Sequence, residues 1–279
     1  MTILDLTGQY VATVNASRNY TSSLTRTARR AASYGLETTC QLSDESACKF
    51  LDCLQAEQYS DTTVHNMRRE LLTLWRYAYL RNLTDSQPGR VRQVAAKFAA
   101  PEAWGKNELR RMFERAREDI TPVAITSKFA VRDVMPGWLM LGYETAARFT
   151  DVYEAGEQDF RRECFVKRAA KTGKVMVWQL SAKCLREVEG LLSRSPDGTL
   201  FKHCLTRRRA FKMWRGFLDR HNFRGTSRWL RRSAATALEA AEPNAASVLL
   251  QHSNPQLVRR HYLDASLLAP AHRPPKFVG

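Results

Sequence analysis

The stretch LLQHSNPQLVRRHYLD, residues 249 to 264, gathers side chains that could do phosphoryl-transfer chemistry. Two histidines, two adjacent arginines and Tyr262 follow an apolar run there. A tyrosine oxygen can attack a phosphodiester and hold it covalently, provided that cations stabilise the charge of the transition state and an acid protonates the leaving oxygen. Tyr262 is therefore either a buried core ring or a nucleophile.

Other catalytic motifs that a strongly basic chain could contain are missing from the sequence. It has no GxxxxGK[ST] phosphate loop, no HExxH, no GxSxG and no acidic cluster with the spacing of a two-metal nuclease. We therefore expect a mechanism that uses no cofactor, no ATP and no metal ion.

Charge and composition indicate a folded protein that binds polyanions. Lys and Arg total 44 against 28 Asp and Glu, a formal net charge of +16, with 44% hydrophobic and 10% aromatic residues. Such a field attracts polyanions and speeds their encounter, and 279 residues suffice for one large domain or two modest ones. Nucleic acid is the expected partner, and a basic surface that is merely solvated is the alternative.

Cysteine spacing and hydropathy indicate whether the protein binds structural zinc, crosses a membrane or lies in a reducing compartment. The six cysteines form no CxxC pair, so we do not expect structural zinc. The first residues lack a basic region followed by a long apolar one, and no apolar run approaches the ~18 residues of a membrane span. We expect a cytoplasmic protein with free thiols and no membrane association.

The first 83 residues are predicted to be helical. The strongest pattern is TTVHNMRRELLTLWRYAYLRNL, in which apolar residues recur at steps of three and four. Arginines lie mostly off that stripe, so the helix is expected to have a basic outer face. Residues 84–103, which contain Pro88-Gly89 and Pro101, are predicted to be a basic interdomain linker.

Residues 104–279 are predicted to be mostly helical with one small sheet. ECFVKRA and VMVWQLS have the composition of strands and flank the turn KTGK, which indicates a β-hairpin. A single helix is predicted over PGWLMLGYETAARFTDVYEA, beginning at Pro136. Further helices are predicted over AKCLREVEGLLSR, RRRAFKMWRGFLDRH, SRWLRRSAATALEAA and PNAASVLLQH.

Five segments, in order, resemble the motifs of the tyrosine recombinase (phage integrase) family. TAARFTD resembles the first arginine motif and places Arg148, and KTGK resembles the lysine hairpin and places Lys171. RWLRRSAAT resembles HxLRR[ST] and places Arg231. LLQHS resembles LLGHS, which places His252, and HYLD places the nucleophile at Tyr262.

The chain departs from the family pattern in two places. Arg228 stands where the family usually has histidine, and Gln251 replaces a glycine. An arginine still donates to a phosphate, but its guanidinium stays charged and cannot take up a proton near neutral pH. In the hairpin, Lys167 and Lys174 compete with Lys171 for the role of the lysine.

The resemblance implies a site-specific recombinase that cleaves and rejoins DNA. Arg148 and Arg231 would grip the scissile phosphate, with Arg228 and His252 as further donors. Tyr262 would form a 3′-phosphotyrosine intermediate while Lys171 protonates the leaving 5′ oxygen.

The resemblance also implies an architecture. Residues 1–83 would be a helical core-binding domain and residues 104–279 an α+β catalytic domain, together a C-shaped clamp on double-stranded DNA. The working form would be a homotetramer on paired sites, monomeric before DNA binding and nucleoid-associated when bound, as part of a mobile element. The DNA-contacting residues would be Arg68, Arg69, Arg76, Arg81, Arg90, Arg92, Lys97, Lys174 and Arg232.

Two other functions remain open at this point. One is an enzyme like the type IB topoisomerases, which shares the chemistry but only relaxes DNA. The other is a catalytically impaired DNA-binding relative, in which Arg228 marks the loss of catalysis. Recombination of two paired sites would distinguish a recombinase from the topoisomerase-like enzyme. A covalent protein–DNA complex would exclude the catalytically impaired relative.

The net charge of +16 predicts a strong salt dependence of DNA binding. If six or more phosphates are contacted, affinity for non-specific duplex should fall about a thousandfold between roughly 50 and 200 mM salt, because each contact releases condensed counterions. Fluorescence anisotropy of a labelled duplex over this range measures the slope. A flat slope would contradict binding over a wide basic surface.

Overall fold

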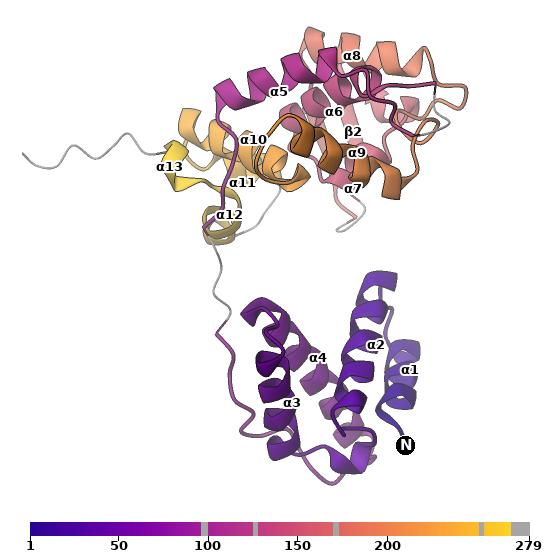
Figure 1. Ribbon diagram of the computed structural model, residues 1–279, viewed down its shortest axis with the longest axis vertical. Helices are drawn as coiled ribbons and strands as arrows, with labels where there is room; N and C mark the ends of the chain where they lie inside the picture. The colour runs from indigo at the N-terminus through magenta and orange to yellow at the C-terminus, as the bar shows by residue number, and fades with distance from the viewer. Residues whose placement is uncertain (96–99, 125–127, 170–172, 251–253, 269–279) are drawn as a thin grey trace, which may run out of the picture. The chain divides into compact units, whose positions relative to one another are not determined.

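The structure is a computed structural model that describes residues 1–95, 100–124, 128–169, 173–250 and 254–268. The chain divides into two compact units, Met1–Ala99 and Ala100–Gly279, each with its own elements (Figure 1). The fold is mainly helical with one small sheet, as the sequence predicts.

The N-terminal unit is a set of helices around an apolar core. Its helices are α1 (Ile3–Thr13), α2 (Arg18–Ser33), α3 (Asp44–Ala56) and α4 (Asp61–Leu80), with a 3₁₀ turn at Thr39–Gln41. The hydroxyl groups of Ser17, Ser43 and Ser60 cap the first turns of α2, α3 and α4. The apolar stripe predicted on α4 is buried, with Val64, Leu74 and Ala78 fully so.

Much of the segment predicted to be a linker packs on the N-terminal unit. Val91 and Val94 belong to its core, and the ring nitrogen of Trp75 donates to the Ser86 carbonyl at 2.6 Å. The Arg68 guanidinium donates to the Arg92 carbonyl at 2.7 Å and to the Val91 carbonyl at 2.9 Å. The described residues 84–95 are thus held by buried apolar side chains and by directed hydrogen bonds.

The C-terminal unit combines helices with a three-stranded antiparallel sheet of order β1-β2-β3. The helices are α5 (Lys106–Glu118), α6 (Val131–Thr145), α7 (Phe149–Tyr153), α8 (Ala182–Leu192), α9 (Arg207–Arg220), α10 (Ser227–Ala241), α11 (Ala245–Leu250), α12 (Pro255–Tyr262) and α13 (Ala265–Leu268). The strands are β1 (Phe160–Arg161), β2 (Cys164–Arg168) and β3 (Val175–Gln179), with a 3₁₀ turn at Glu157–Asp159 before β1. The β2–β3 pair is the hairpin predicted around KTGK, in a register that places Cys164 opposite Gln179.

Tryptophans organise the core of the C-terminal unit. Trp104, Trp138 and Trp214 are each no more than 2% exposed, and Trp104 stacks on Trp214 with ring centroids 6.5 Å apart. Trp138 packs against Phe201 at 4.3 Å. Large aromatic side chains contribute much of the apolar area that a core buries, so these rings fix how α6 and α9 pack.

The single helix predicted from Pro136 onward is wrong in its start and in its continuity. The Asp133 carboxylate accepts the Ala130 N–H at 2.8 Å, which caps a helix that begins at residue 131 and leaves Pro136 inside it. Ala146 then adopts a left-handed conformation with φ 46°, which ends α6. The chain restarts as the short helix α7, and the break lies next to Arg148.

Small residues allow α10 to approach its neighbours closely. A Cβ atom on Gly142 of α6 would lie 2.6 Å from a methyl carbon of Leu230 on α10. Gly225, with φ +109°, lies under the Trp229 ring, which a Cβ atom there would meet at 2.5 Å. Because Leu230 precedes Arg231, this packing sets where Arg231 lies.

Among the described residues, no helix is long and apolar enough to cross a membrane.

A buried carboxylate joins the end of α5 to the end of α9. Asp119 accepts from the Arg220 guanidinium at 2.6 Å and lies 3.1 Å from the His221 ring nitrogen. Burial acts to raise the pKa of Asp119, but hydrogen bonds from Arg220, Thr121 and His221 outweigh it and lower this pKa to about 2.

Replacing Asp119 should make folding less stable near neutral pH. A carboxyl whose pKa falls from 3.8 to about 2 on folding contributes about 2 kcal/mol above pH ~4, and this is lost as the pH falls through the folded value. We expect Asp119→Asn to lower the free energy of unfolding by that order at pH 7 and by much less at pH 2.5, measured by urea denaturation.

Asp219→Asn is the matched control. Asp219 pairs with Arg215 on the exposed side of the same helix, and surface ion pairs stabilise little. An equal loss of stability in both variants would contradict the special role of Asp119.

Candidate active site

Arg231 is the buried centre of the candidate site. It lies on α10 and is only 6% exposed. Its guanidinium donates to the Ala146 carbonyl and, at 3.4 Å, to the Leu250 carbonyl. Burial and then the nearby Arg148 charge lower the pKa of Arg231, and Tyr262 acts in the opposite direction. Its Nε has no hydrogen-bond partner within the part of the chain that the structure describes.

Arg148 lies at the break between α6 and α7, next to the site. It is the N-cap residue of α7 and has an extended backbone. Its guanidinium lies 3.8 Å from the Asp151 carboxylate, and its side chain is 24% exposed. The two arginines are close enough for the charge of Arg148 to affect the pKa of Arg231. The site therefore holds two guanidinium groups near each other, one buried and one accessible.

Tyr262 is the last residue of α12 and is half-buried. The guanidinium carbon of Arg231 lies 5.3 Å from the centre of its ring. The ring contacts a small apolar cluster that includes Ala235, Leu250, Val258 and Leu263. Tyr262 is thus both packed and next to the buried arginine, and the structure brings it together with Arg148 and Arg231.

Helix α12 was not among the helices predicted from the sequence. Pro255 is the first residue of α12, and the Asn254 side chain caps it, accepting from the Gln256 N–H at 2.9 Å. Proline at the first helical position after a capping asparagine is a helix-start signal. The sequence therefore contained the signal for the element that carries Tyr262.

The other arginines of α10 lie differently from Arg231. Arg228, in the first turn of the helix, is exposed. Arg232 is half-buried and lies 3.5 Å from the Glu102 carbonyl, to which it donates. The adjacent arginines 231 and 232 thus point to different surroundings, as their positions on one helix require.

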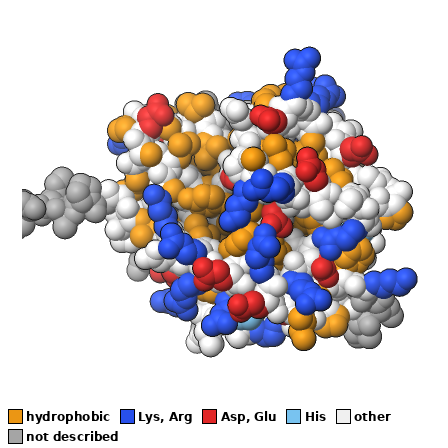
Figure 2. Space-filling view, turned by 90° about the horizontal axis from the view of Figure 1, so that it is seen from above, with side chains coloured by type: hydrophobic (Ala, Val, Ile, Leu, Met, Phe, Trp, Pro, Cys, Tyr) orange, Lys and Arg blue, Asp and Glu red, His pale blue; other side chains and the backbone are white. Residues whose placement is uncertain are grey.

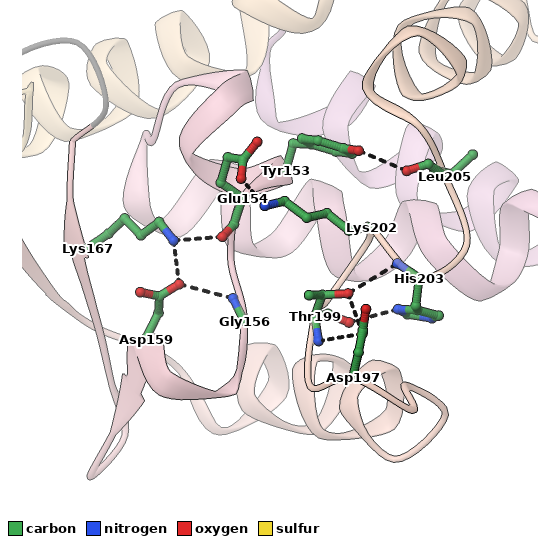
Figure 3. Close-up of polar contacts among 10 residues, drawn as sticks. All are labelled: Tyr153, Glu154, Gly156, Asp159, Lys167, Asp197, Thr199, Lys202, His203 and Leu205. Atoms are coloured by element: carbon green, nitrogen blue, oxygen red, sulfur yellow. Dashed lines mark hydrogen bonds and ion pairs between the residues drawn. The ribbon is translucent and has the colours of Figure 1, made fainter.

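Two of the three hairpin lysines can be described. Lys167 is held by the Asp159 carboxylate at 2.5 Å and by the Glu154 carbonyl at 2.7 Å (Figure 3). In the same network Lys202 pairs with Glu154. Lys174 is exposed beyond the turn. Because Lys167 is bound by Asp159 and Glu154, it is a poor candidate for a mobile proton donor.

Three predicted site residues lie outside the described residues: Lys97, Lys171 and His252.

The basic residues predicted on the N-terminal unit are not equivalent. Arg69 and Arg76 of α4, Arg81 just after it, and Arg90 are exposed. Arg92 is exposed and pairs with Asp52 at 2.7 Å. Arg68 is half-buried and binds backbone carbonyls of its own unit. The spacing of arginines on a helix does not reveal such contacts.

The first basic surface that the sequence analysis missed is the outer face of α9. Its exposed residues include Arg207, Arg208, Arg209, Phe211, Lys212 and Arg215. Phe211 stacks on Phe149 with ring centroids 3.9 Å apart, which brings the start of α9 next to α7 and Arg148. The signal in the sequence was the run RRR at 207–209, followed by basic residues at helical spacing.

The second missed surface is a groove of about 830 Å³ on the N-terminal unit. It is lined by Arg26, Arg29 and Arg30 of α2, together with serine and threonine side chains and Tyr59. Arg30 is bound to Glu57 and Tyr59, whereas Arg26 and Arg29 are exposed.

Basic side chains elsewhere are interleaved with acidic ones. Figure 2 shows Lys and Arg side chains spread over the face in view, with acidic and hydrophobic side chains between them. On the C-terminal unit Arg117 pairs with Glu187, and Arg194 with Asp133 at 3.1 Å. The excess positive charge is therefore concentrated on particular surfaces, such as α9, where acidic partners are few.

Within the described ranges, no group of three or more His, Cys, Asp or Glu side chains is arranged to hold a metal ion.

Comparisons of sequence give no match, either to a protein-family model or to a curated protein. Comparisons of structure do. A lambda integrase dimer bound to a COC′ core site matches with a TM-score of 0.75 and 12% identity, covering 100% of this chain and 99% of that one. The Tn1549 transposon integrase in complex with circular intermediate DNA matches with a TM-score of 0.74 and 15% identity, covering 95% and 96%. The chain has the integrase fold.

A lambda integrase tetramer bound to a Holliday junction also matches, with a TM-score of 0.74 and 13% identity, covering 94% of this chain and 76% of that one. The integrase fold thus accounts for nearly the whole chain, including the helices and the hairpin that carry the candidate site. At this level of identity the match is one of architecture, and it confirms the fold predicted from the sequence motifs.

Because Arg228 is exposed, its proposed role as a phosphate donor can be tested by substitution. If it only donates to a phosphate, Arg228→Ala should slow DNA cleavage while leaving DNA affinity nearly unchanged, and Arg228→His should retain or raise cleavage. Rates of covalent complex formation and gel-shift affinities measure the two effects.

Arg224→Ala is the control, because Arg224 is also exposed and lies just before α10. If Arg228→Ala unfolds the protein or abolishes DNA binding, this arginine has a structural or docking role instead.

Proposed function

We propose that this protein is a tyrosine-type site-specific DNA recombinase that cleaves and rejoins strands through a 3′-phosphotyrosyl intermediate. The observation that carries the proposal is the position of Tyr262, whose ring lies 5.3 Å from the guanidinium carbon of the buried Arg231. The integrase fold and the order of the sequence motifs support the same conclusion.

The two arginines suit a phosphate that carries developing negative charge. Arg148 is accessible, and Arg231 holds a buried Nε donor with no partner among the described residues. A guanidinium presents its donors in a planar fork that matches phosphate oxygens. In a site shielded from water such donors stabilise the transition state more strongly than they would in bulk solvent.

The proposed reaction forms one bond and breaks one. The Tyr262 oxygen attacks the scissile phosphorus, a phosphorus–oxygen bond to tyrosine forms, and the bond to the 5′ oxygen breaks. Lys171 gives a proton to that leaving oxygen, and His252 accepts the proton of the phenol, since Arg228 stays charged. The bond energy remains in the phosphotyrosine, so a 5′-hydroxyl can reverse the step and no ATP is consumed.

Two other tyrosines in the unit are less suited to attack. The Tyr153 hydroxyl donates to the Leu205 carbonyl at 3.0 Å, and its side chain is buried (Figure 3). Burial raises the pKa of Tyr143, which disfavours its anion. Tyr262 is the tyrosine that lies against Arg231.

The partner we propose is double-stranded DNA, bound by basic residues of both units. The surfaces that suit phosphates are the α9 face, the groove beside α2 and the exposed arginines of α4. A homotetramer on two paired sites is the proposed working form, and a lambda integrase tetramer bound to a Holliday junction matches this chain in structure. The protein would be cytoplasmic and associate with the nucleoid through DNA.

The Tyr262→Phe variant tests the proposal directly. It keeps the ring packing and removes the attacking oxygen, so it should fold and still shift DNA in a gel. On a suicide substrate nicked beside the cleavage position, the wild type should give a protein–DNA adduct that survives SDS, and the variant should give none. Substrates are taken from the DNA that flanks the gene.

Tyr153→Phe is the control and should retain the adduct. An undiminished adduct from Tyr262→Phe would assign the nucleophile to another residue. No adduct from the wild type would favour a DNA-binding protein without catalysis, and relaxation of supercoiled DNA without exchange of paired sites would favour the topoisomerase-like activity.

A further inference from the structure

The backbone around Tyr262 is held by one side chain of α10. The Thr236 hydroxyl accepts the Asp264 N–H at 3.0 Å and lies 3.4 Å from the Tyr262 carbonyl, to which it donates. Thr236 is 2% exposed; its bond to Asp264 is buried and its bond to Tyr262 partly buried. A buried hydroxyl that uses its donor and an acceptor on one segment fixes that segment strongly.

Asp264 extends this contact to the start of the C-terminal unit. It is 9% exposed, and one carboxylate oxygen accepts the Ala103 N–H at 2.9 Å. The other oxygen accepts the N–H of Ser266 at 3.0 Å and its hydroxyl at 2.6 Å.

One turn earlier on α10, the Ser233 hydroxyl accepts the Trp104 N–H at 2.7 Å. Residues 103–104 and the segment just after Tyr262 are therefore held against the same helix.

Helix α10 also carries Arg231, five residues before Thr236. The group that faces the ring of Tyr262 and the group that holds its backbone are thus on one rigid element. The apolar cluster around Val258 and Leu263 packs the Tyr262 ring, and Thr236 holds the backbone that carries it.

From these contacts we propose that Thr236 and Asp264 are positioning residues, which hold Tyr262 in line with the phosphate gripped by Arg231. The inference rests on the proposed function. It adds that the nucleophile is tied to the residues where the chain enters the C-terminal unit, so a shift of residues 103–104 reaches Tyr262 through Asp264. Neither residue touches the reacting atoms.

The experiment compares four variants in single-turnover adduct formation on the nicked substrate. Thr236→Val keeps the volume and loses both hydrogen bonds, Thr236→Ser keeps the hydroxyl, and Asp264→Asn leaves one acceptor oxygen in place of two. Asp119→Asn is the control, since it alters a buried carboxylate that contacts α9. DNA affinity and amide hydrogen exchange over residues 255–264 are measured on the same proteins, at a temperature where all are folded.

We expect Thr236→Val and Asp264→Asn to slow adduct formation by about 10- to 100-fold, because a small misplacement of a nucleophile has effects of that size. DNA affinity should stay within about twofold, exchange in residues 255–264 should accelerate, and Thr236→Ser should react at the wild-type rate. Asp119→Asn should lose stability without slowing the reaction.

Wild-type rates in Thr236→Val and Asp264→Asn would overturn the inference, and so would an equal slowing in Asp119→Asn. If the wild type forms no adduct, the proposed function fails. Hydrogen exchange still tests whether Thr236 and Asp264 hold the segment that carries Tyr262. Unchanged protection of residues 255–264 in Thr236→Val and Asp264→Asn would then show that these side chains do not hold the segment.

Discussion

The interior position of the Arg231 guanidinium is the constraint on which the surrounding structure depends. A buried charge is costly unless it is paired or hydrogen-bonded. Here the partners are backbone carbonyls at Ala146 and Leu250 and the face of the Tyr262 ring. These partners come from the end of α6, the end of α11 and the end of α12, so three segments distant in sequence must meet at one side chain. Misplacing either carbonyl would leave a buried donor unsatisfied, at a cost of about 1–3 kcal/mol or more.

A few residues with special backbone properties bring these segments together. Gly142 lets α10 lie close to α6, and the left-handed Ala146 turns its carbonyl toward Arg231 while it frees Arg148 from the helix. A left-handed alanine is strained by about 1 kcal/mol. The burial of Ala146 in the apolar cluster with Leu250 and Val258 helps to offset that strain. The positions of Arg231 and of the groups around it are thus fixed by packing.

The sequence predicted those parts of the fold that depend on periodicity and missed those that depend on tertiary contacts. The apolar stripe of α4 and the hairpin around KTGK follow from spacing alone. The break after Thr145 does not, because alanine carries no signal for a left-handed turn. Nor could spacing show that the Arg68 guanidinium bonds to backbone of its own unit. Motif order predicted Arg148, Arg231 and Tyr262 as site residues, whereas their proximity and burial are properties of the folded chain.

The packing of residues 84–95 on the N-terminal unit decides where this chain can be divided for separate study. A fragment that stops at residue 83 would remove the acceptor of the Trp75 ring nitrogen and both acceptors of Arg68. It would also uncover the apolar surface that Val91 and Val94 cover in the core. Such a fragment would tend to self-associate through that surface. The natural place to cut lies after residue 95, and an N-terminal fragment chosen by sequence alone would end too early and misrepresent the unit as poorly soluble.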